Sequence, residues 1–74
     1  MEMFVAQVFT DSADWADLGE ADRYLEDAVD RIAQAARYRR NGLEDVFRVL
    51  RRGRGPERVE ITPMTGAEAV EWMA

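Results

Sequence analysis

Acidic side chains recur at helical spacing in the first half of the chain. Asp22, Glu26 and Asp30 follow one another at intervals of four residues, so a helix would stack them about 6 Å apart on one side. Carboxylates in such a row can imitate a phosphate backbone and bind an Arg- or Lys-rich groove of a partner protein. The alternative is an ordinary solvated helix face. With the neighbouring acids and one tryptophan, the predicted partner-binding residues are Asp14, Trp15, Asp17, Asp22, Glu26, Asp27 and Asp30.

Trp15 belongs to this set because it lies among acids in the sequence and because Trp is enriched at the hot spots of protein interfaces. The alternative for Trp15 is packing over a sheet.

Arginines gather in the second half of the chain, around a Gly-Arg-Gly-Pro turn. Guanidinium groups match phosphate oxygens, so a second hypothesis is nucleic-acid binding through Arg48, Arg51, Arg52 and Arg54. The alternative is that these arginines pair with the acids of the chain itself. A pI of about 4.6 and the absence of an RRM, KH or zinc-finger signature make direct nucleic-acid binding the less favoured hypothesis.

The composition excludes much catalytic and metal chemistry. The 74 residues contain no Cys and no His, and all ten basic residues are Arg. Thiolate nucleophiles, imidazole bases and ligands, and lysine Schiff bases are therefore absent. Asp11, Asp14 and Asp17 do not match the spacing of an EF-hand loop, and capping of a helix explains them better. We expect a protein that is not an enzyme and has neither cofactor nor bound metal.

Charge is distributed unevenly along the chain, whose formal net charge is −5. Residues 1–30 carry nine acids and one base, whereas residues 31–58 carry nine Arg and three acids. Such asymmetry describes partners and electrostatic steering, and says nothing about the fold.

Hydrophobic periodicity predicts the elements that carry these side chains. Residues 3–9 form a short apolar run typical of a buried strand. Residues 18–38 have apolar positions on one side of a helix, which we expect to end at a left-handed Asn41-Gly42 stop.

The remaining elements follow from turn and capping signals. Residues 45–52 and 57–62 read as a hairpin, although residues 43–52 also fit one face of a helix. Thr65 and Glu68 have the spacing of a capping box, which opens a short helix through Trp72.

The predicted fold is a single α+β domain over residues 1–74, in the order β-α-β-β-α. A three-stranded, mostly antiparallel sheet carries one long amphipathic helix and a short C-terminal helix. A mostly helical domain is the alternative if residues 43–52 are helical.

The leading functional hypothesis is a non-catalytic regulator or inhibitor that binds a protein with a basic surface, such as a nucleic-acid-binding complex. Phages and mobile elements use small acidic chains against nucleic-acid-handling defence machinery. The hypothesis therefore extends to a DNA mimic, an anti-CRISPR-type viral protein, on grounds of size and charge alone.

The third hypothesis is a homodimer or assembly subunit, built through an exposed apolar patch of Met64, Trp72 and Met73. No run approaches the roughly 18 to 20 apolar residues of a membrane span. Met1-Glu2 also lacks the basic start of a signal peptide. We therefore expect no membrane partner and a cytoplasmic protein, in the host cytoplasm if a phage encodes it.

Overall fold

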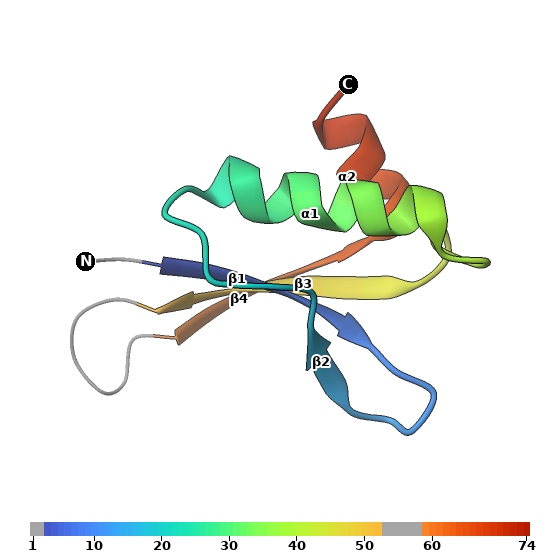
Figure 1. Cartoon of the computed structure of the whole chain (residues 1–74), viewed down its shortest axis with the longest axis horizontal. Helices are drawn as coiled ribbons and strands as arrows, with labels where there is room; N and C mark the ends of the chain where they lie inside the picture. The colour runs from blue at the N-terminus through green and yellow to red at the C-terminus, as the bar shows by residue number, and fades with distance from the viewer. Residues whose placement is uncertain (1–2, 53–58) are drawn as a thin grey trace.

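The computed structural model describes residues 3–52 and 59–74 of the chain. Four strands and two helices follow one another in the order β-β-α-β-β-α (Figure 1). They are β1 (Met3–Phe9), β2 (Trp15–Asp17), α1 (Leu25–Tyr38), β3 (Val46–Arg52), β4 (Val59–Thr65) and α2 (Gly66–Trp72).

The strands form one antiparallel sheet in the order β2-β1-β3-β4, and both helices lie on the same side of it (Figure 1). The prediction of an α+β fold with the long helix and the short C-terminal helix is confirmed. The prediction of three strands is wrong, because β2 adds a fourth strand at the edge beside β1. Residues 46–52 are a strand, so the helical alternative for residues 43–52 is wrong as well.

The core lies between the sheet and the helices. Large buried side chains come from the two central elements, Phe47 and Val49 on β3 and Val29 and Ile32 on α1. Val8 faces the helices from β1, in register with Phe47. Because side chains alternate along a strand, the neighbouring positions on β1 and β3 point to the other side, which carries no helix.

The start of α1 differs from the prediction for a physical reason. The apolar period begins at Leu18, but residues 18–24 run beside β1 as an irregular segment and α1 begins only at Leu25. Leu18 N–H donates to the Ala6 carbonyl, and Asp22 and Phe4 exchange two backbone hydrogen bonds of 2.7 Å. Pairing with β1 therefore satisfies backbone groups that a longer helix would have satisfied internally.

The capping box of α2 is confirmed. Thr65 Oγ1 accepts a hydrogen bond from Glu68 N–H at 3.1 Å, and Glu68 Oε1 accepts one from Thr65 N–H at 2.8 Å. These two bonds satisfy groups that would otherwise be unpaired where the chain turns from β4 into α2.

Gly42 has a different role from the predicted helix stop. The last residue of α1 is Tyr38, and its C-cap Arg39 is extended rather than left-handed. A Cβ on Gly42 would collide with the Ala36 carbonyl, and one on Gly66 would collide with the Gly42 carbonyl oxygen. The two glycines allow the loop after α1 and the start of α2 to approach at backbone contact.

Candidate functional site

Three acids of α1 lie outside the stripe of buried residues on that helix. Glu26 and Asp27 are exposed, and Asp30 is half-buried and accepts a hydrogen bond from Gln34 Nε2 at 2.8 Å. We call Glu26, Asp27 and Asp30 the acidic α1 face. In the described part of the chain, none of the three forms an ion pair with an arginine.

Asp22 does not belong to that face. Its carboxylate accepts two hydrogen bonds from Arg31, at 2.6 Å from Nε and 3.1 Å from Nη2. These bonds and the negative charge of Asp22 raise the pKa of Arg31 above its ordinary value, with smaller contributions from the charges of Glu20 and Asp27. Asp22 is thus engaged within the molecule, and the predicted row of Asp22, Glu26 and Asp30 is not formed.

The other predicted partner-binding residues lie at the far end of the molecule. Asp14 is exposed in the loop between β1 and β2, where its Oδ1 accepts a hydrogen bond from Trp15 N–H at 2.8 Å. Trp15 and Asp17 belong to β2 and pair with the second half of β1. Since α1 begins near Phe4, at the first half of β1, the structure separates this group from the acidic α1 face (Figure 1).

A chain of polar and aromatic contacts crosses the sheet face that carries no helix. Asp17 Oδ1 accepts a hydrogen bond from Gln7 Nε2 at 2.6 Å, and Gln7 Oε1 accepts one from Arg48 Nε at 2.7 Å. The guanidinium carbon of Arg48 lies 4.1 Å from the centre of the Trp15 ring, and Trp15 meets Phe9 edge to face at 5.1 Å. Trp15 therefore packs over the sheet.

Sequence reasoning missed this network because β2 was not expected. The alternation along residues 46–52 does place Arg48 on one side of a strand, and that was the available signal. Nothing local to residues 15–17 indicates that they pair with β1.

The predicted nucleic-acid-binding arginines are divided between the two sides of the sheet. Arg48 and Arg52 alternate onto the side without helices. Arg51 is in register with Phe4 on the helix side, where both border a gap of about 170 Å³ beside Leu25. Arg54 lies outside the described residues. Within the described part of β3, then, the arginines do not form one basic surface.

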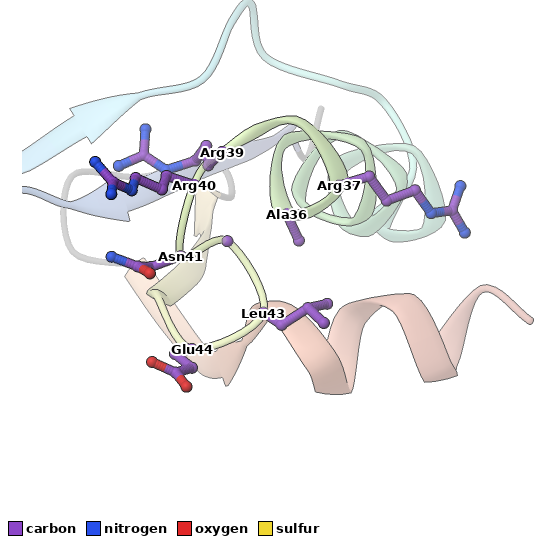
Figure 2. A pocket seen from close by; sticks show the side chains of 8 residues that line it. Ala36, Arg37, Arg39, Arg40, Asn41, Leu43 and Glu44 are labelled. Carbon is purple, nitrogen blue, oxygen red and sulfur yellow. The ribbon is translucent and has the colours of Figure 1, made fainter.

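A hollow of about 430 Å³ opens where α1 ends, lined by residues 36–37 and 39–44. Figure 2 shows that Arg37 points to one side of the helix end while Arg39 and Arg40 point to the other. Arg39 Nε also donates to Asp45 Oδ2 at 2.7 Å. Because the guanidinium groups do not converge, the hollow lacks the geometry of an anion site.

The apolar patch predicted for self-association is not formed as expected. Met64 is buried under the helices, whereas Trp72 and Met73 are partly exposed on and just after α2. These three side chains therefore do not share one surface.

No group of three or more acidic side chains within residues 3–52 and 59–74 is placed to hold a metal ion. Neither helix in the described chain is long and apolar enough to cross a membrane. Comparisons with protein-family models, with curated proteins and with solved structures found no match.

Proposed function

We propose that this protein is a non-catalytic protein-binding regulator whose acidic α1 face docks on a basic surface of a partner protein. One observation supports the proposal. The carboxylates of Glu26, Asp27 and Asp30 project from the helix without an ion-pair partner among the described residues.

The stability of α1 explains why some, but not all, of these acids are present. Acids in the first turn of a helix complement the positive end of its dipole, which explains Glu26 and Asp27. Asp30 lies in the second turn, where that effect has faded, and it stands four residues after Glu26. Like charges at this spacing destabilise a helix by a few tenths of a kcal/mol. A cationic partner surface relieves that repulsion and gains from electrostatic steering.

A partner that ordinarily binds nucleic acid fits this chemistry best, because its surface already suits a row of negative charges. The protein then acts by occupying that surface, as a DNA mimic does, and an anti-CRISPR-type inhibitor is one form of such a regulator. Direct binding of nucleic acid by Arg48, Arg51 and Arg52 is less favoured, since these residues lie on both sides of the sheet.

The test compares the wild type with two variants of equal charge. The first variant, Glu26→Gln/Asp27→Asn/Asp30→Asn, removes the acidic α1 face. The control, Asp11→Asn/Glu44→Gln/Glu71→Gln, removes three exposed acids elsewhere. Each tagged protein captures partners from a nuclease-treated lysate of the organism that encodes it, with washes at rising salt.

We expect one protein to be captured by the wild type and the control, released by salt, and lost from the first variant. Equal capture by all three proteins would show that the acidic α1 face is not the docking surface. A partner that is captured from untreated lysate but lost after nuclease treatment would instead support nucleic-acid binding by the arginines.

A further inference from the structure

On the sheet face without helices, an acid and a base lie on opposite sides of β1. Gln7 lies in register with Asp17 of β2 on one side and with Arg48 of β3 on the other. Neighbouring strands are about 4.8 Å apart, so the acid and the base stand at equal distances from β1 in one row.

Each charged group in this row keeps hydrogen-bonding capacity toward solvent. Asp17 uses Oδ1 for Gln7, and Arg48 uses Nε for Gln7. Among the described residues, Asp17 Oδ2 and the two Nη atoms of Arg48 have no hydrogen-bond partner. Gln7 is only 9% exposed and holds both groups in place, so the unused atoms are oriented in advance.

Apolar side chains lie on both sides of the charged row. Toward the end of β1, the side chain of Phe9 is 43% exposed and lies beside Trp15. Val46, the first residue of β3, is 47% exposed. Toward the start of β1, Val5 is half-buried and in register with Leu50, which is buried. The face thus exposes apolar surface toward the end of β1 and carries one acid, Asp17, and two bases, Arg48 and Arg52.

We propose that a second copy of this chain packs on this face, with a two-fold axis running along β1. Rotation by 180° about that axis exchanges the two sides of β1. Asp17 of each copy then meets Arg48 of the other, and Phe9 meets its own counterpart. Two packed sheets are usually rotated by about 30° relative to each other. Asp17 and Arg48 lie only one strand away from the axis, so this rotation shifts them by about 2 to 3 Å and keeps them close to their partners.

Charge complementarity identifies the occupant as a second copy. A nucleic acid that binds Arg48 would also place a phosphate against Asp17, which repels it. A uniformly basic protein would be repelled by Arg48, and a uniformly acidic one by Asp17. In the two-fold arrangement both pairs are opposite in sign. The acidic α1 faces also point away from each other, because α1 lies on the other side of each sheet (Figure 1).

The size of the face predicts a weak dimer. Four short strands offer on the order of 400 Å² of flat sheet, about half of what each partner contributes to a standard interface of roughly 800 Å² per side. We therefore expect association to depend on protein concentration, and to increase as salt is lowered.

Sedimentation equilibrium tests the proposal. The weight-average mass of the wild type is expected to rise with concentration from 8.5 kDa toward twice that value. Asp17→Arg alone and Arg48→Asp alone each place like charges together, so each variant is expected to remain at one chain mass. An equimolar mixture of the two variants restores opposite charges at both contacts and is expected to associate.

Phe9→Glu provides a second variant that leaves the Asp17–Gln7–Arg48 chain intact. It places two carboxylates on the axis and is expected to abolish the dimer, with its helix and strand content unchanged by circular dichroism. The triple variant of the acidic α1 face is expected to dimerise as the wild type does. Failure of the dimer proposal can therefore be distinguished from failure of the proposed function.

A wild type that stays at one chain mass up to millimolar concentration would overturn the proposal. So would single variants that associate as the wild type does, or a mixture of them that fails to associate.

Discussion

The guanidinium of Arg31 holds the carboxylate of Asp22 through two hydrogen bonds, and Gly19 lies beside it. A Cβ on Gly19 would stand 2.5 Å from Arg31 Nη1, so the absence of a side chain leaves room for the ion pair. The backbone of Asp22 meanwhile pairs with Phe4 of β1. One residue thus connects the loop before α1 both to the sheet and to the helix.

Asp22→Ala is expected to lower the free energy of unfolding, because it removes both side-chain hydrogen bonds and leaves Arg31 without its partner. Glu20→Ala is the matched control, since Glu20 acts on Arg31 through charge alone. Urea unfolding of the two variants measures the difference. Equal unfolding midpoints would show that the ion pair does not stabilise the loop.

Arg31 also determines how the pair responds to base. Its pKa is raised by Asp22, so the folded state binds this proton more tightly than the unfolded state does. The contribution of the Asp22–Arg31 pair to the free energy of unfolding is therefore complete at pH values below the ordinary arginine pKa. It is lost only as the pH rises through the raised pKa of Arg31.

At the scale of the elements, local signals in the sequence predict the structure well wherever the interactions are local. The apolar run of β1 and the capping box of α2 are examples, and both are confirmed. The three residues of β2 could not be predicted, because β2 exists through its pairing with β1. The turn before it contains Ala13 at a φ of 59°, a conformation that glycine usually adopts and that an alanine does not indicate.

Thr65→Ala is expected to cost about 1 kcal/mol of unfolding free energy, because it removes the hydroxyl that caps α2. Thr65→Ser keeps the hydroxyl and should stay close to the wild type. Chemical denaturation of both variants measures the effect. If the two variants were equally destabilised, side-chain packing rather than the cap would be the cause.

Gly66→Ala is expected to destabilise the protein by about 1 to 3 kcal/mol, because the added Cβ meets the backbone carbonyl of Gly42 and forces α2 away from the loop after α1. Glu71→Ala adds no such contact at an exposed position of the same helix and serves as the control. Thermal unfolding compares the two. A Gly66→Ala variant as stable as the control would contradict the close approach of these backbones.

Across the whole molecule, the fold brings some acids of the first half of the chain to arginines of the second half and leaves other acids unpaired. The two ion pairs of the described residues, Arg31 with Asp22 and Arg39 with Asp45, leave the acidic α1 face unneutralised. Helical periodicity was sufficient to place Glu26, Asp27 and Asp30 outside the buried side of α1, but it wrongly added Asp22 to them. It could not predict that Trp15 and Asp17 face the opposite side of the sheet, since that depends on the pairing of β2.

The most direct measurement of the proposed function is the affinity of the captured partner for the wild type and the two charge variants at several salt concentrations. Three exposed ion pairs of roughly 0.5 kcal/mol each amount to about a tenfold change in affinity. We predict that Glu26→Gln/Asp27→Asn/Asp30→Asn binds about tenfold more weakly with a flatter salt dependence, while the control variant binds as the wild type does. An unchanged affinity and salt dependence in the first variant would contradict docking through the acidic α1 face.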